Sequence, residues 1–291
     1  MDNTTANKTI SLQIRKLVIR DIEKGESHRK IAEKYGCSKA AKISLIVLSI
    51  RVTLVVGYEI DCHIGDCCDN ASLWNCQQRT HPYHVALFKG KEFLCGGSIV
   101  DRQWILTAAH CVIELDGSIS KDVKVLAGTA HLKKGGTYLK PDKIFPHEQY
   151  GSSGNDIALI KLEKTIEFNE HMQKIELSAA EVPDNSSVII TGHGRTGNGE
   201  PISEILKHNT MYTLSDEECH AAIQSERKGI MCINNQIDNG ACLGDSGGPA
   251  VYDSKQVGVA NFYITMCGGE KPDGYAKVAY YADWIAETMK K

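Results

Sequence analysis

The stretch Gly244-Asp245-Ser246-Gly247-Gly248-Pro249 decides how this chain is interpreted. A serine hydroxyl is a poor nucleophile at its own pKa, so it needs an imidazole within hydrogen-bond reach and a buried carboxylate that holds the imidazole. Two upstream stretches supply these groups: Thr107-Ala108-Ala109-His110-Cys111 and Asn155-Asp156-Ile157-Ala158-Leu159. The sequence therefore predicts a catalytic triad of His110, Asp156 and Ser246.

The order of the three residues along the chain narrows the class further. Nucleophilic triads occur on unrelated folds, and each fold has its own order. The order His, Asp, Ser differs from that of subtilisin and of the α/β-hydrolases. From Val85 to Ile285 the chain resembles the trypsin/chymotrypsin family of serine proteases, and in detail it is similar to insect chymotrypsin-like digestive enzymes. The first eighty residues lie outside this resemblance.

The pattern after Pro82 is typical of an all-β protein. Short alternating runs separated by Gly, Asp and Asn predict strands at 84–88, 98–106, 123–128, 157–162 and 188–192. The resemblance implies two antiparallel six-stranded β-barrels, with the catalytic groups in the cleft between them. We expect residues 280–291 to form a closing helix, with Trp284 and Ile285 packed against the second barrel.

The resemblance also implies a role for each residue of the site. Ser246 would attack the scissile carbonyl, His110 would act as general base and then acid, and Asp156 would orient the imidazole. The backbone amides of Gly244 and Ser246 would form the oxyanion hole, a contribution typically worth about 3 kcal/mol. Gly247 and Gly248 would permit the tight turn. An acyl-enzyme intermediate follows from this arrangement, and no cofactor is expected.

The specificity pocket departs from the trypsin pattern. Gly240 stands at the base, where trypsin-type enzymes carry the Asp that selects Lys or Arg. Asp273 stands on the pocket wall, where Gly is usual. Its carboxylate could extend into the pocket from the side, or it could be turned away from the pocket and have only a structural role. Asn261 and Phe262 also match the family pocket, and Tyr263 would narrow its neck. We expect a preference for aromatic or large apolar residues over basic ones.

Eleven cysteines favour an oxidising compartment and therefore a secreted protein. The resemblance implies three disulfides, each worth about 2 to 4 kcal/mol in the loop-entropy account: Cys95–Cys111, Cys219–Cys232 and Cys242–Cys267. The pairing of the other five, Cys37, Cys62, Cys67, Cys68 and Cys76, stays open. With His63, the last four could be taken for a metal site, but their spacing fits no standard zinc pattern, and a disulfide-tied knot or a poorly pairing insertion is favoured. No metal is expected.

Residues 1–42 form a separate, basic segment. Apolar residues recur at helical spacing from Leu12 to Ile22, Gly25 breaks the run, and Ser27 can cap a second helix. Ten Lys and Arg stand against five Asp and Glu, an excess suited to phosphates. The segment resembles the helix-turn-helix of transposases and pipsqueak-type DNA-binding proteins, in which the last helix enters the major groove. A nucleic-acid partner is expected through these residues alone.

Residues 43–57 are apolar and follow Lys39 and Lys42. Fifteen residues with Arg51 inside are too few to span a bilayer, which takes about 20, but they fit the apolar region of a secretory signal, despite their internal position. A buried strand is the alternative. We therefore divide the chain into a helix-turn-helix-like segment (1–42), a signal-like segment (43–57), a Cys-rich connector (58–81) and a protease domain (82–291).

Activation is where the chain departs most from the family. Family zymogens are cut after a basic residue to release Ile or Val before Val-Gly-Gly, and the new amine pairs with the Asp before the nucleophile, here Asp245. The nearest match, Val55-Val56-Gly57, follows Leu54 and lacks the second glycine. We therefore hypothesise that the chain as written is not properly activatable.

These observations combine into a secreted, monomeric serine endopeptidase with chymotrypsin-like specificity. Its partners would be polypeptide substrates and protein protease inhibitors. The net charge of −3 does not discriminate between function classes. Two alternatives are a catalytically silent protease homologue, favoured by the activation segment, and a DNA-binding protein that uses residues 1–42.

Overall fold

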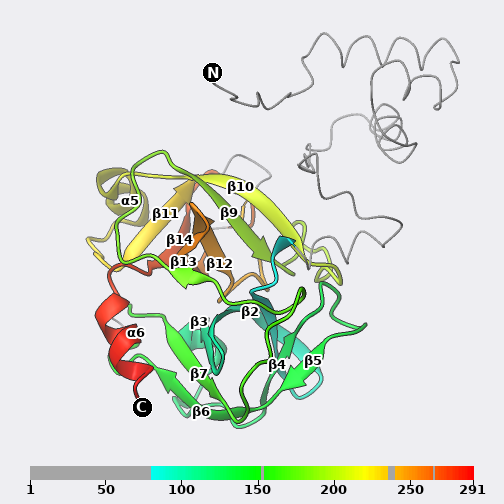
Figure 1. Ribbon diagram of the computed structural model, residues 1–291. Coiled ribbons are helices and arrows are strands. Elements are labelled where there is room, and N and C mark those ends of the chain that lie inside the picture. Colours follow the sequence, from blue (N-terminus) through cyan, green and yellow to red (C-terminus); the bar gives the residue numbers. More distant parts are fainter. Residues whose placement is uncertain (1–79, 152–153, 235–239, 265) are drawn as a thin grey trace, which may run out of the picture. The chain divides into compact units, whose positions relative to one another are not determined.

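The computed structural model describes residues 80–151, 154–234, 240–264 and 266–291. The segments 1–42 and 43–57, and the connector up to Arg79, lie outside the described residues, so the expectations for them stay predictions. The described part consists of two groups of strands, β1 to β7 and β8 to β14, with few helices (Figure 1). None of the described helices has the length and apolar character needed to cross a membrane.

The first sheet has the strand order β5-β4-β1-β2-β3-β7-β6, and all of its pairings are antiparallel. Its strands are β1 (His84–Lys89), β2 (Glu92–Asp101), β3 (Trp104–Thr107), β4 (Val123–Ala127), β5 (Thr137–Leu139), β6 (Pro141–Pro146) and β7 (Ala158–Leu162). Only Lys140 separates β5 from β6, yet β5 pairs with β4 and β6 pairs with β7. The segment 137–146 thus joins the two edges of the sheet and closes it as a barrel of six chain segments.

The second sheet closes in a different way. Its strands are β8 (Glu176–Leu177), β9 (Ser187–Gly192), β10 (Lys207–Thr213), β11 (Ile230–Asn234), β12 (Pro249–Tyr252), β13 (Lys255–Phe262) and β14 (Asp273–Lys277). Strand β12 pairs with both β9 and β13, so the six strands β9 to β14 form a closed ring. The two-residue β8 adds to β13 in parallel. The predicted pair of antiparallel six-stranded barrels is confirmed.

Each barrel has its own apolar interior because alternate strand residues point inward. The first interior is built around fully buried side chains such as Leu87, Ile105 and Ile160. The second contains Val188, Ile233 and other buried residues of β9 to β14. Such burial is worth about 25 cal/mol per Å² of apolar surface and is the main stabilising contribution. Rigid barrels can therefore carry functional groups on the loops at their junction.

The helices are short. The 3₁₀-helix η1 covers Ala109–Cys111 and α5 covers Asp216–Ile223. A capping box starts α5: the Ser215 hydroxyl accepts from the Glu218 amide, and the Glu218 carboxylate accepts from the Ser215 amide. The last helix, α6, covers Ala282–Thr288.

The predicted helix near the C-terminus exists, but the prediction of its docking site is wrong. Ile285 belongs to the apolar cluster of the first barrel, and Trp284 donates from Nε1 to Glu148 Oε2 at 2.8 Å. The Trp284 ring also lies 5.0 Å from the ring of His147. Figure 1 shows α6 beside β6 and β7. An amphipathic stretch specifies a face to bury, but it does not specify the neighbour.

Candidate active site

His110 and Asp156 are hydrogen-bonded to each other. His110 Nδ1 lies 2.7 Å from Asp156 Oδ2, and the His110 amide donates to Asp156 Oδ1 at 2.9 Å. Strand pairing explains the contact: Thr107 at the end of β3 is paired with Ala158 at the start of β7, and the two functional residues lie just beyond these ends. Their side chains are 33% and 17% exposed, so the carboxylate is shielded while the imidazole is accessible.

The Ser246 turn comes from the second barrel and packs against the segment that leads to His110. The Gly96 amide of β2 donates to the Ser246 carbonyl at 2.8 Å. A side chain at Gly247 would place its Cβ 2.2 Å from Thr107 Oγ1, and the residue has φ 78°, so only glycine fits. The Cys95–Cys111 disulfide ties the residue before Gly96 to the residue after His110. The Ser246 turn thus packs beside the segment that carries His110, while His110 Nε2 lies 3.7 Å from Cys111 Sγ and, within the described residues, no hydrogen bond joins it to the Ser246 hydroxyl.

Gly244 and Ser246 stand on either side of Asp245 in the sequence. Within the described residues, neither amide donates to a protein acceptor. Gly244 has φ 101°, and a Cβ on it would lie 2.7 Å from Ile202 Cδ1. The turn therefore leaves two backbone donors available beside the serine, which is the arrangement that stabilises a developing oxyanion.

The Asp245 side chain lies against the end of β9 and the residues that follow it. Its carboxylate accepts from the Gly194 amide at 2.8 Å and from the Cys242 amide at 2.9 Å. Desolvation raises its pKa to about 6, against the opposing effect of the two amides. Among the described residues no Lys, Arg or His forms an ion pair with it.

The predicted pocket residues lie on β13 or directly after it, on β14 and in the segment before Ser246. Asp273 is 1% exposed, and its Oδ2 accepts from the Ala241 amide at 2.6 Å, next to Gly240. The Phe262 ring lies over Gly274, where an added Cβ would meet ring carbons at 2.3 to 2.6 Å. Tyr263 is partly exposed, whereas Asn261 is 7% exposed. The Cys242–Cys267 disulfide ties the chain before Ser246 to the loop after β13.

The structure contains the three disulfides that the family resemblance implies. Cys95–Cys111 lies in the first barrel, and Cys219–Cys232 and Cys242–Cys267 lie in the second. Ligand atoms of Cys95, His110 and Cys111 lie within 4.8 Å of one another, but both sulfurs are used in the disulfide. Cysteine binds zinc as a thiolate and a disulfide sulfur is not one, so this group is not a zinc site.

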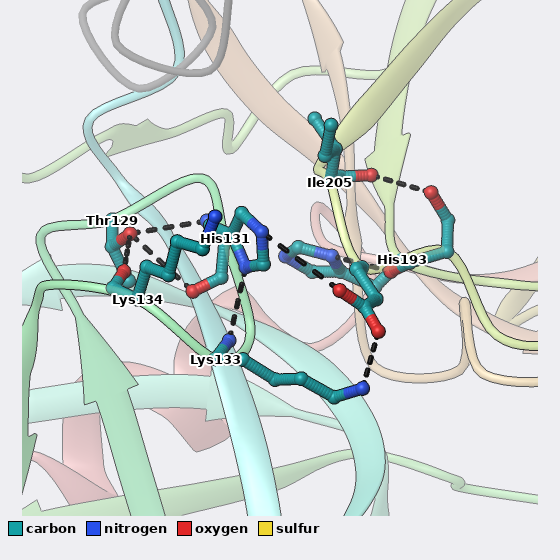
Figure 2. Close-up of polar contacts among 8 residues, drawn as sticks. Thr129, His131, Lys133, Lys134, His193 and Ile205 are labelled. Atoms are coloured by element: carbon teal, nitrogen blue, oxygen red, sulfur yellow. Dashed lines mark hydrogen bonds and ion pairs between the residues drawn. The ribbon is translucent and has the colours of Figure 1, made fainter.

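A line of histidines lies at the junction of the barrels and was not predicted from the sequence. His81 and His208 are joined at 3.0 Å between Nε2 and Nδ1, and the rings of His84 and His193 lie 5.8 Å apart. His193 Nδ1 donates to the Ser203 carbonyl at 3.0 Å, and His131 faces Glu204. Figure 2 shows His131 and His193 beside the segment that contains Ile205. Isolated histidines have no spacing signal, so only the fold reveals the cluster.

Burial strongly affects these histidines. It lowers the pKa of His81 to about 3 and that of His193 to about 4, and it lowers the pKa of His84 well below its usual range. Neighbouring histidines lower these values further. The His84 Nδ1 is bonded to Thr191 Oγ1 at 2.9 Å, while its Nε2 is buried without a hydrogen-bond partner in the described part. The burial of the junction therefore favours the neutral form of the imidazoles of His81, His84 and His193.

Two antiparallel barrels with a histidine–aspartate pair beside a serine turn define the class of trypsin-like serine proteases. The family model described as Trypsin matches residues 74–285. The chain therefore belongs to the trypsin family, and it is a serine-type endopeptidase.

Individual relatives agree with this assignment. The chain is 39% identical over 213 residues to Serine protease SP24D of Anopheles gambiae, covering 72% of this chain and 77% of that protein. It is 31% identical to Trypsin II-P29 of Gallus gallus, with 74% and 87% covered. The solved structure of neuropsin, a serine protease expressed in the limbic system of mouse brain, superposes with a TM-score of 0.68 at 28% identity, covering 74% of this chain and 98% of that one.

Proposed function

We propose that this endopeptidase is secreted and cleaves polypeptides through an acyl-enzyme formed on Ser246. The contact between His110 and Asp156 is the observation that carries the proposal, because an imidazole held on one nitrogen by a carboxylate is oriented to accept a proton on the other. His110 takes the hydroxyl proton of Ser246 and later delivers it to the leaving amine. Asp156 stabilises the imidazolium, and the amides of Gly244 and Ser246 stabilise the oxyanion.

A substitution series tests the triad. Ser246→Ala and His110→Ala should each lower kcat by about 10⁴-fold or more. Ser203→Ala is the matched control, since Ser203 is a serine near the junction whose hydroxyl donates to a main-chain carbonyl. A fluorophosphonate should label the wild type and Ser203→Ala, and it should not label Ser246→Ala. Turnover that survives Ser246→Ala would refute the triad. A folded wild-type chain that does not label even when an Ile-Val dipeptide is added to occupy the Asp245 site would favour the silent homologue.

We propose a preference for aromatic or large apolar residues at the cleaved bond. Gly240 supplies no charge at the pocket base, and the Asp273 carboxylate is engaged by the Ala241 amide. Peptide p-nitroanilides that differ only in Phe, Leu, Lys or Arg at the cleaved position test this proposal. A higher kcat/KM for Lys or Arg would contradict it and assign the side carboxylate to substrate binding.

We propose that Asp245 must receive an α-amine before the oxyanion hole becomes rigid, because the carboxylate is desolvated without a described cation. Val55 follows Leu54 rather than a basic residue, so trypsin should not release it. Incubation of the chain with trypsin and a chromogenic peptide, with a family zymogen as control, tests the hypothesis that the chain is not properly activatable. Full turnover would overturn it.

Secretion and the domain boundaries also remain proposals. The disulfides fit an oxidising compartment, and residues 43–57 fit a secretory signal. Amino-terminal sequencing of the product from cell medium would show whether residues 1–57 are removed and where the protease domain begins. Recovery of the chain only inside the cells would contradict secretion.

A DNA-binding role for residues 1–42 is a separate proposal that depends on their charge excess. A mobility-shift titration of the full chain at two salt concentrations tests it. Binding that weakens with salt and disappears when Arg29 and Lys30 are both replaced by Ala would support it.

A further inference from the structure

One surface turn of the second barrel has a sequence that the proposed peptidase activity does not use. Asn185-Ser186-Ser187 matches the acceptor pattern for N-linked glycosylation, which is an asparagine, any residue except proline, and then serine or threonine. Three further triplets of this kind lie outside the described residues and begin at Asn3, Asn7 and Asn70. Such triplets are common in protein sequences, so the structure around Asn185 decides whether this asparagine can carry a glycan.

Asn185 lies in an exposed turn directly before β9, which begins at Ser187. It has φ 55°, a left-handed backbone conformation that asparagine adopts more readily than most residues. Its backbone amide donates to the Thr213 carbonyl at 3.0 Å, so main-chain contacts hold the turn. Among the described residues, neither the Asn185 side-chain amide nor the Ser187 hydroxyl has a hydrogen-bond partner. A group attached to Asn185 Nδ2 would therefore break no hydrogen bond of the described fold.

The outer face of the sheet beside this turn leaves room for a large group. Successive side chains of a strand point to opposite faces, and along β9 Ser187 and Ile189 are exposed. Tyr212 of β10 pairs with Ser187 and is 43% exposed, while Ile189 is 39% exposed. Because these side chains are exposed, no described segment covers this face. A glycan is bulky and belongs on the surface, and here the folded protein can accommodate it.

The turn is also remote from the serine turn. Strand β9 runs from Ser187 to Gly192, and a Cβ on Gly192 would lie 1.9 Å from Asp245 Oδ1. Five steps of extended chain cover about 17 Å. Asn185 precedes the opposite end of this strand. A glycan on Asn185 would therefore stand away from the residues that surround the nucleophile.

We propose that Asn185 receives an N-linked glycan while the chain passes through the secretory compartment. The inference rests on the proposed secretion, because the transferase and its donor, a lipid-linked oligosaccharyl diphosphate, act in that compartment. In the transfer, the bond between sugar C1 and the diphosphate oxygen breaks, and a bond between C1 and Asn185 Nδ2 forms. Nδ2 loses one proton and the lipid diphosphate leaves, so the step needs no oxidant or reductant. The three disulfides fit the same oxidising compartment.

Peptide mass analysis of the full chain tests this proposal. The chain is expressed in cultured insect cells, and the culture medium and the cells are digested separately with trypsin. Asn185 then lies in the peptide 175–195 and Asn70 in the peptide 52–79, so the two acceptors are measured independently. A peptide N-glycosidase in heavy-oxygen water converts each glycosylated asparagine to a labelled aspartate. We expect this label on Asn185 in the secreted chain.

Three variants provide the controls. Ser187→Ala removes the hydroxyl that the acceptor pattern requires but keeps Asn185, so the label on Asn185 should be lost. Ser187→Thr restores a hydroxyl and should keep the label. Asn70→Gln leaves the turn intact and should leave the label on Asn185 unchanged. Ser187 is exposed, so these variants should keep the melting temperature of the enzymatically deglycosylated wild type.

The outcomes separate the modification from secretion. A secreted wild-type chain without the label on Asn185 would overturn the inference and leave secretion standing. A label that persists in Ser187→Ala would also overturn it, because the label would then come from deamidation and not from a glycan. A chain found only inside the cells and without the label would refute both proposals.

Discussion

The Gly194 amide donates to Asp245 Oδ1 at 2.8 Å in a site where no side chain could replace the glycine hydrogen. A Cβ on Gly194 would lie 2.2 Å from Asp245 Oδ2, and one on Gly192 would lie 1.9 Å from Oδ1. Two glycines of β9 and its extension thus form the wall around a carboxylate that directly precedes the nucleophile. The charge state of Asp245 is therefore linked to the shape of the oxyanion hole.

Occupation of the Asp245 site by an amine should stabilise the protein. The folded-state pKa of about 6 lies above the ordinary value of 3.8, so ionisation of Asp245 costs stability as pH rises through this window, and the full cost is present above pH 6. A dipeptide such as Ile-Val supplies a cation that offsets the cost. We expect it to raise the melting temperature more at pH 7 than at pH 5.

The matched control for this experiment is the N-acetylated dipeptide, which lacks the positively charged α-amine. Asp245→Asn should abolish the difference between the two dipeptides. Equal thermal shifts from both dipeptides on the wild type would show that Asp245 does not bind the amine.

The junction histidines should make the protein sensitive to acid. Their folded-state pKa values lie below the ordinary 6.5, at about 3 for His81 and about 4 for His193. The contribution of these histidines to the free energy of unfolding is therefore complete above pH 6.5. It is lost as pH falls towards 4, because in this range the unfolded chain binds more protons than the folded chain. We expect the melting temperature to fall by about 5 °C or more between pH 7 and pH 4.5.

Substitution at His193 identifies the source of this acid sensitivity. His193 packs edge-on against Phe93 at 5.8 Å, so His193→Phe should be accommodated and should flatten the dependence of melting temperature on pH. His171→Gln is the control, because that side chain is 36% exposed. If both variants keep the wild-type slope, carboxylates rather than the junction histidines cause the acid sensitivity.

Asp273→Asn should leave the substrate preference unchanged. The asparagine oxygen can still accept from the Ala241 amide, so the local structure is retained while the charge is removed. The ratio of kcat/KM for Phe and Lys substrates is the measurement. A selective loss of activity on Lys substrates by more than about tenfold would show that the carboxylate binds basic side chains.

The ion pair between Lys133 and Glu204 should contribute little. Both side chains are largely exposed, at 70% and 49%, and surface pairs are worth about 0 to 1 kcal/mol. Main-chain bonds hold the same contact, with Leu132 N donating to Glu204 O at 2.9 Å near the cluster of Figure 2. Glu204→Gln should shift the denaturation midpoint only slightly, and high salt should remove the difference. A loss of several kcal/mol would assign the pair a larger role.

Sequence patterns predicted the parts of this molecule that depend on local chemistry. The flanks of His110, Asp156 and Ser246 each predicted a functional residue, and the alternating runs predicted strands. The family resemblance supplied the barrels and the disulfide pairs. These properties are readable because turn glycines, alternation and motif order are all encoded over a few neighbouring residues.

Contacts between segments that are far apart in the sequence could not be predicted from such local patterns. The helix α6 packs against the first barrel because His147 and Glu148 happen to lie beside Trp284. The histidine line forms because β1 of one barrel meets β9 and β10 of the other. The side-chain amide of Asn261 donates to the Asp156 carbonyl, a contact between distant segments that the sequence did not predict.

Each of the three described disulfides is confined to one barrel. Across the junction, the described contacts include apolar packing, in which Val259 and Ala276 join the core cluster of the first barrel, and hydrogen bonds such as those of His84 with Thr191 and Ser98 with Gln256. Reducing agents would therefore sever no covalent link between the halves, and non-covalent contacts alone keep the serine turn of one half beside the histidine of the other.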